Sequence, residues 1–205
     1  MTDETVARIE VAAGLLVLGL ASISTTRRAL APWELATFHA LNQLPDGLHP
    51  PIWSVMQLGA LGAAPATAAF AFAFGDRPLA TRLLVAGTSA WLSAKLVKRI
   101  VDRGRPATLF TDLRLRGRGP SGGGFPSGHA AVATALAASA FARSRPAARL
   151  TLTGLAATVG VARVYVGAHL PLDVLGGAAL GVTLDGVFKM GAPRRASHTN
   201  RRRTD

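Results

Sequence analysis

Long apolar runs separated by short arginine-containing breaks constrain the fold of this chain more than any other feature. The 205 residues are 49% hydrophobic with a mean hydropathy of +0.31, which fits either a compact soluble domain or a small membrane protein. The distribution of the apolar residues separates the two, because several runs approach the roughly 20 residues that a membrane-spanning helix needs. We therefore expect an all-α, polytopic membrane protein.

The apolar runs predict six transmembrane helices, with a short interfacial helix over residues 31–44 between the first and the second. Pro65 is expected to kink the second span. The fourth span is shorter than the hydrocarbon core is thick, at 1.5 Å of rise per residue. The six predicted spans cover residues 7–25, 52–74, 79–97, 128–142, 147–165 and 171–190.

The first span could also be the apolar region of a secretory signal peptide. Such a peptide starts with positive charge and ends in a small-residue cleavage site, whereas Asp3, Glu4 and Glu10 outnumber Arg8 here. A retained helix is the better interpretation. Residues 1–191 are then expected to form a single six-helix membrane domain, and residues 192–205 a basic, disordered cytoplasmic tail.

The chain is strongly basic, with a net charge of +12. In a soluble protein this charge would suggest nucleic acid, but the basic residues here punctuate apolar spans, which fits membrane topology and anionic headgroups better. No nucleic-acid partner is expected. Six spans put both termini on one side, and the lysine and arginine distribution favours cytoplasmic termini with the long polar loop outside. The absence of cysteine excludes disulfides and thiolate metal sites.

Three polar clusters fall at span ends on the outer side of this topology. Each has a simple explanation by itself: basic residues reaching toward headgroups, a helix cap, or a local hydrogen-bonded pair. Their coincidence on one face favours a functional site. The clusters are Lys98 with Arg105-Pro106, then Pro126-Ser127-Gly128-His129, and finally Arg163 with His169 and Asp173.

The chemistry of these residues suits a phosphate group. Lys98, Arg105 and Arg163 are permanent cations that match charge spread over phosphoryl oxygens. Ser127 and Gly128 stand at the start of a predicted helix, after a glycine-rich stretch, where unpaired backbone N–H groups bind anions.

Two histidines can divide the acid and nucleophile roles. Asp173 lies four residues after His169, so its carboxylate can hold one ring nitrogen and leave the other free to attack. His129 comes from another helix and can protonate a leaving oxygen. Neither a carboxylate cluster for magnesium nor a third zinc ligand is present, so no metal or cofactor is expected.

The three clusters resemble the signature motifs of the type 2 phosphatidic acid phosphatase (PAP2) superfamily, which comprises integral-membrane lipid phosphatases and soluble vanadium haloperoxidases. The motifs cover residues 98–173, and the six-span layout extends the resemblance over nearly the whole chain. The resemblance implies a metal-independent phosphatase that passes through a phosphohistidine. His169 would be the nucleophile, His129 the general acid and Asp173 the residue that orients His169.

The same resemblance implies a set of phosphate-binding residues: Lys98, Arg105, Ser127, Gly128 and Arg163. One position departs from the family pattern, because Ala162 stands where a serine usually precedes the arginine. A lost hydroxyl contact is worth about 1 kcal/mol. One phosphate contact is therefore in doubt, but phosphatase activity is still expected.

The expected substrate is a lipid phosphate, with polyprenyl phosphates or diphosphates ahead of phosphatidylglycerophosphate and phosphatidic acid. A non-catalytic phospholipid-binding or transport protein is the alternative from another class, although binding alone would not need both histidines and Asp173. The predicted spans disfavour a haloperoxidase. The expected location is the bacterial plasma membrane, with the active site facing outside, and the sequence leaves the oligomeric state open.

Overall fold

The computed structural model describes residues 2–26, 30–117 and 122–191. These ranges contain α-helices, short 3-10 turns and no strand, so the all-α prediction is confirmed for them. The helices are α1 (Asp3–Thr25), α2 (Pro32–Asn42), α3 (His49–Met56), α4 (Ala63–Ala73), α5 (Arg77–Ile100), α6 (Pro106–Leu109), α7 (Gly128–Ala140), α8 (Pro146–Tyr165) and α9 (Pro171–Gly191).

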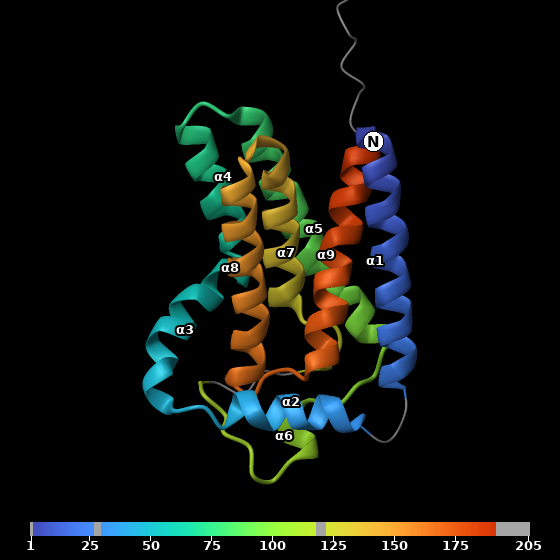
Figure 1. The fold of residues 1–205 in the computed structure, drawn as a ribbon, viewed down its shortest axis with the longest axis vertical. Coiled ribbons are helices and arrows are strands. Elements are labelled where there is room, and N and C mark those ends of the chain that lie inside the picture. Colours follow the sequence, from blue (N-terminus) through green and yellow to red (C-terminus); the bar gives the residue numbers. More distant parts are fainter. Residues whose placement is uncertain (1, 27–29, 118–121, 192–205) are drawn as a thin grey trace, which may run out of the picture.

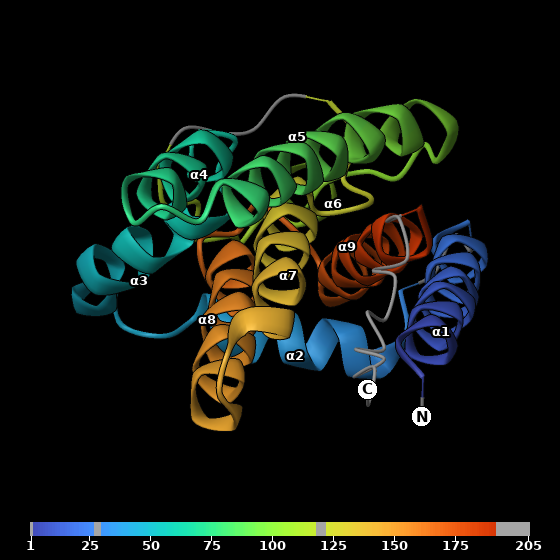
Figure 2. The same ribbon diagram turned by 90° about the horizontal axis from the view of Figure 1, so that it is seen from above.

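Helix α7 is the centre of the bundle and packs against α5, α8 and α9 (Figure 2). Helix α1 lies along the outer side of α9, and α4 lies along α5. Most of α7 is buried, and its core positions are largely alanine, whose small side chain lets neighbouring helices approach closely. Helix α2 lies across one end of the bundle (Figure 1), and its Phe38 stacks on Phe110, the residue that follows α6.

The predicted second span is two helices, α3 and α4, which are bent by 74° relative to each other. The bend falls at residues 60–62, just before Pro65, so the second span is interrupted where the proline predicts, as a break between two helices and not as a kink within one. Pro65 lies in the first turn of α4, where a proline costs no hydrogen bond. Gly59 is the last residue before the break and Gly62 lies within it, and glycine is a poor helix former.

Two helices among the described residues, α1 and α9, are long and apolar enough to cross a membrane. A third crossing is possible if the bent pair α3 and α4 counts as one span. Large apolar side chains are also exposed around the outside of the bundle, as expected of a surface that contacts lipid. Examples are Leu16, Ile23, Phe74, Ile100 and Leu150. The predicted tail at residues 192–205 lies outside the described residues.

A buried ion-pair network lies near the end of the bundle opposite α2. The carboxylate of Asp185 has no accessible surface and lies 2.6 Å from Arg82 NH2 and 2.8 Å from Lys189 Nζ. Ser139 donates a further hydrogen bond to it at 3.0 Å, and Lys189 also binds Glu10. The pairing of Asp185 with Lys189, suggested by their spacing of four residues, is present. The network as a whole joins α9 to α1, α5 and α7.

Candidate active site

The three predicted clusters meet at the end of the bundle that α2 covers (Figure 1). Lys98 lies in the last turn of α5, and Arg105 directly precedes α6. Ser127 caps α7, Arg163 lies in the last turn of α8, and Asp173 in the first turn of α9. Hydrogen bonds between these segments, described below, hold the clusters together.

A tight turn between α8 and α9 carries His169 back beside Arg163. Gly167 has a φ of +76°, which glycine adopts without strain, and it ends α8. The backbone N–H groups of Ala168 and His169 both donate to the carbonyl of Arg163, at 3.1 and 3.2 Å. Pro171 then starts α9, a position that suits its fixed φ. The sequence Gly-Ala-His-Leu-Pro therefore fixes where His169 lies.

The two ring nitrogens of His169 face different partners. Nδ1 lies 3.4 Å from Asp173 Oδ2, close to this carboxylate although not aligned for a formal hydrogen bond. Nε2 lies 3.5 Å from Arg105 NH1. Because an arginine can only donate, Nε2 is the nitrogen that keeps its lone pair. This is the arrangement that a nucleophilic Nε2 requires.

Asp173 is fully buried and holds several segments at once. Its Oδ2 accepts the backbone N–H of Leu170 at 2.8 Å, which satisfies a free donor at the start of α9. Its Oδ1 accepts from Arg103 NH1 at 2.8 Å. Its backbone carbonyl accepts the N–H of Ser127 at 2.8 Å. The second and third clusters are therefore joined through this one residue.

The glycine-rich loop is fixed by two of the predicted cations. Lys98 Nζ donates to the carbonyls of Gly123 and Gly124 at 3.0 and 3.2 Å. Arg105 donates through Nε to the carbonyl of Gly122 at 2.7 Å and through NH1 to that of Ala168 at 2.9 Å. A Cβ at position 124 would meet the carbonyl oxygen of Gly104 at 2.8 Å, so the close approach of these loops requires glycine there.

Ser127 begins α7 as the sequence predicts. Its hydroxyl accepts the N–H of Ala130, with the two atoms 3.4 Å apart, and Gly128 is the first helical residue. His129 follows in the first turn, within electrostatic range of Arg163, His169 and Lys98. All eight predicted site residues therefore lie at the same end of the bundle.

Arg163 faces a small cavity of about 140 Å³. Its NH1 contacts the sulfur of Met56 at 3.2 Å, its buried Nε has no partner, and no carboxylate among the described residues lies within ion-pair distance of it. His49, Trp53 and Met56 of α3 form one wall of the cavity. A guanidinium without a counter-ion beside a cavity is suited to binding an anion.

Ala162, which stands in place of the usual serine, has no accessible surface. It packs in an apolar cluster with Met56, Tyr165, Val166 and Ala168. Within the described residues there is no group of three or more His, Asp or Glu side chains that could hold a metal ion.

Two site residues were missed by the sequence analysis. Arg103 lies between two carboxylates, with NH1 on Asp173 at 2.8 Å and NH2 on Glu34 at 2.7 Å. Burial acts to lower the pKa of Arg103, but its hydrogen bond to Glu34 and the charge of Asp173 outweigh this and raise that pKa. The pairing of Glu34 with Arg103 spans 69 residues of sequence, and no local spacing signals it.

The charges of the site leave it attractive to an anion. Lys98, Arg105 and Arg163 contribute three positive charges, while Glu34, Arg103 and Asp173 together carry one net negative charge. Positive charge therefore exceeds negative charge by two in this group. A phosphate dianion would balance that excess.

The sequence matches the PAP2 superfamily over residues 79–195, more than half of the chain. The chain therefore belongs to the PAP2 superfamily, as its three motifs indicated. The match includes every predicted site residue from Lys98 to Asp173 and leaves the helices α1 to α4 outside it.

Individual relatives agree with this assignment. The chain is 40% identical over 95 residues to lipid A 1-phosphatases of Rhizobium johnstonii and Rhizobium etli. The match covers 44% of this chain and spans 38% and 40% of these curated relatives' lengths.

Two solved structures share the fold. Aquifex aeolicus LpxE aligns with a TM-score of 0.69 at 26% identity, covering 77% of this chain and 94% of that one. A transmembrane PAP2-type phosphatidylglycerolphosphate phosphatase from Bacillus subtilis aligns with a TM-score of 0.73 at 22% identity, covering 88% and 94%. These membrane-protein neighbours and the two apolar helices indicate that this chain, too, is a membrane protein.

The environment of His169 predicts an unusual titration. Burial lowers the pKa of His169 to about 4, against the opposing effect of Asp173. Because this value lies below the ordinary 6.5, the ring should stay neutral as the pH falls through 6 and gain a proton only near pH 4. NMR of ¹⁵N-histidine-labelled protein measures this directly, with the His169 signal assigned by its loss in His169→Gln. A midpoint at or above about 6 would contradict the burial argument.

Proposed function

We propose that the protein is a lipid phosphatase that removes phosphate from a membrane lipid through a phosphohistidine on His169. The observation that carries the proposal is the placement of His169, with Asp173 behind Nδ1 and the cation Arg105 in front of Nε2. A binding or transport protein would need the cations, but it would have no use for a histidine held in this way. Membership of the PAP2 superfamily and the lipid A 1-phosphatase relatives support the same activity.

In the first step, Nε2 of His169 attacks phosphorus, and the bond to the leaving oxygen breaks. Lys98, Arg105 and Arg163 stabilise the charge on the phosphoryl oxygens, together with backbone N–H groups at Ser127 and Gly128. Asp173 stabilises the positive charge that develops on the ring through Nδ1–H. His129 donates a proton to the leaving oxygen. The lipid therefore departs as an alcohol when the substrate is a monoester, and as a lipid monophosphate when the substrate is a diphosphate.

In the second step, water attacks the phosphohistidine. His129, now unprotonated, takes a proton from that water, and the N–P bond breaks to return His169 and release inorganic phosphate. This reversal of roles for His129 follows from microscopic reversibility. The cycle returns the enzyme to its starting state without any other reactant.

We place this site in a six-span topology with cytoplasmic termini, as a single domain over residues 1–191. Counting α3 with α4 as one crossing, the helices α1, α5, α7, α8 and α9 bring the total to six crossings, and α2 lies at the outer interface across the site. Helix α7 is short, so His129 lies below the ends of its longer neighbours. A lipid headgroup could then reach the cations while its apolar tail stays in the bilayer of the plasma membrane.

For the substrate we favour a polyprenyl phosphate or diphosphate. The cavity beside Arg163, walled by Trp53 and Met56, offers apolar contact next to a cation, which suits the junction between a phosphate and a hydrocarbon chain. The relatives favour two further candidates, a lipid A 1-phosphate and phosphatidylglycerophosphate. These three classes of lipid define the panel that a test must include.

The direct test is phosphate release from undecaprenyl phosphate, undecaprenyl diphosphate, lipid A 1-phosphate and phosphatidylglycerophosphate by purified protein. We expect turnover of at least one of them and a loss of at least about 10⁴-fold in His169→Gln, because the nucleophile is removed. His39→Gln, which changes a histidine of α2 whose ring contacts that of Phe110 edge to face, is the matched control and should keep its activity. Vanadate binding without release of phosphate from any lipid would favour the binding protein instead.

Changing the general acid should separate two classes of substrate. A monoester expels an alkoxide that needs a proton, whereas a diphosphate expels a better leaving group. His129→Ala is therefore expected to slow monoester hydrolysis by about 10² to 10⁴ and diphosphate hydrolysis by clearly less. Steady-state kcat on undecaprenyl phosphate and diphosphate makes the comparison. Equal losses on both substrates would argue against His129 as the proton donor.

A further inference from the structure

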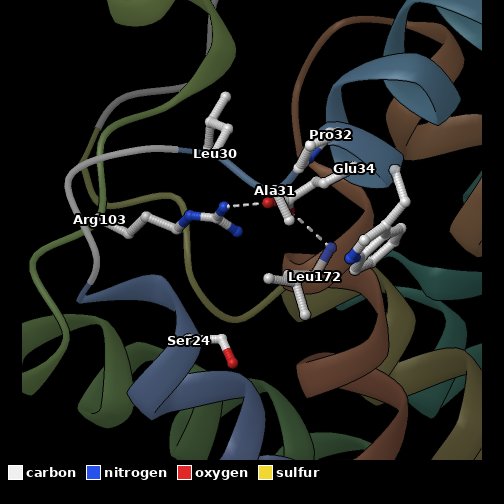
Figure 3. A pocket seen from close by; sticks show the side chains of 8 residues that line it. Ser24, Leu30, Ala31, Pro32, Glu34, Arg103 and Leu172 are labelled. Atoms are coloured by element: carbon white, nitrogen blue, oxygen red, sulfur yellow. Dashed lines mark hydrogen bonds and ion pairs between the residues drawn. The ribbon is translucent and has the colours of Figure 1, made fainter.

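Two buried charged residues lie behind the proposed nucleophile, on the side away from the phosphate cations. Glu34 of α2 is 1% exposed and Arg103 is 6% exposed. Figure 3 shows the two side chains facing each other, with Glu34 also accepting the backbone N–H of Leu172. A cavity of about 320 Å³ borders this pair and is not lined by His169 or Asp173. Neither residue is therefore placed to touch the substrate.

Arg103 creates an electrostatic problem for the site that Glu34 corrects. A lone guanidinium on Asp173 Oδ1 would neutralise the carboxylate that His169 depends on. Glu34 takes the second edge of the same guanidinium at 2.7 Å, so the group of three keeps one net negative charge. That charge lies behind His169, where it favours the positive ring of the attacking and phosphorylated states.

Glu34 also fixes the backbone that carries Asp173. Its Oε1 accepts the N–H of Leu172 at 2.9 Å, one of the donors that the first turn of a helix leaves without an intrahelical partner. A carboxylate at this end of α9 also interacts favourably with the helix dipole. Helix α2 is thereby bound to the residue next to Asp173 as well as to its ion-pair partner.

We propose that Glu34 and Arg103 are positioning residues, which hold the Asp173 carboxylate in place behind His169 and keep the charge there negative. This inference rests on the proposed role of His169 as the nucleophile. Glu34 acts on the reaction through Arg103 and Leu172, and Arg103 acts through Asp173.

The charge balance at His169 includes groups from every element packed around it. These are Glu34 of α2, Lys98 of α5, Arg103 and Arg105 of the following loop, His129 of α7, Arg163 of α8 and Asp173 of α9. A change confined to Glu34 or Arg103 leaves all the phosphate-binding groups in this set intact. Its effect should therefore fall on the rate of the chemical step.

The test compares Glu34→Gln with Asp185→Asn. The glutamine keeps the shape of Glu34 and an oxygen for the Leu172 N–H, but it removes the charge. Asp185→Asn removes an equally buried charge from the network at the other end of the bundle. We expect Glu34→Gln to lower kcat by about 10-fold or more, as for other partners that orient a functional histidine, with KM unchanged. Asp185→Asn should lower the Tm but keep kcat within about two-fold.

A double variant supplies a readout that a purely structural role would not give. Glu34→Gln with Arg103→Gln removes one charge of each sign, so the net charge behind His169 returns to that of the unmodified protein. We expect this double variant to recover part of the kcat lost in Glu34→Gln, although it removes more of the buried network. In ¹⁵N-histidine NMR, the titration of His169 should move to lower pH in Glu34→Gln and return toward its original position in the double variant.

Three results would overturn the inference. The first is a kcat for Glu34→Gln that falls no further than that of Asp185→Asn at a similar Tm. The second is a double variant slower than Glu34→Gln, and the third is an unmoved His169 titration in Glu34→Gln. Failure of the proposed function would give a different result. If His169 is not the nucleophile, His169→Gln retains phosphatase activity, and this result does not depend on the kcat of Glu34→Gln.

Discussion

The buried carboxylate of Asp173 is the interaction on which the rest of the site depends. A buried carboxylate without hydrogen-bond partners is costly. Here separate parts of the chain supply the partners that the Asp173 carboxylate needs. Arg103 and the Leu170 N–H bind its two oxygens, and His169 lies beside one of them. Arg103 belongs to the loop after α5, while Leu170 and His169 belong to the turn between α8 and α9, so this one carboxylate at the start of α9 joins that loop to that turn.

The proposed phosphate-binding side of the site is built from side chains that hydrogen bonds already hold in place. Lys98 and Arg105 bind the carbonyls of the glycine-rich loop, and Gly124 allows that loop to lie against Gly104. Cations fixed in advance need little reorganisation when charge develops on a phosphoryl group. Arg163 differs, since its guanidinium contacts a methionine sulfur beside a cavity, and it is the cation best placed to adapt to a substrate.

Motif spacing made most of the site predictable. Asp173 four residues after His169, Pro171 in the first turn, and Ser127 before an alanine-rich run are local signals, and each has the expected place in the fold. The helix boundaries were predictable to within a few residues for the same reason, since apolar runs and prolines mark them. Pro65 indicated an interruption of the second span, and the span is bent by 74° just before it, but the proline did not show that the two halves would be separate helices.

Glu34 and Arg103 could not be predicted in this way. Their pairing depends on α2 lying across the start of α9, a tertiary contact that neither helix signals by itself. Glu34 stands in a stretch that reads as an interfacial helix, where an acidic residue would normally face water. Partners separated by 69 residues are brought together only when the bundle is assembled. The sequence could therefore indicate the groups that we propose to react, but not Glu34 and Arg103, which lie behind them.

The central claim is that phosphate passes through His169, and trapping the covalent intermediate tests it most directly. Protein mixed with a turned-over lipid phosphate, quenched in alkali within milliseconds and digested, should yield a phosphorylated peptide that contains His169. The modification should be stable to base and labile to acid, and it should be absent from His169→Gln. Phosphate found on His129, or turnover with no phosphorylated peptide at any quench time, would contradict the account.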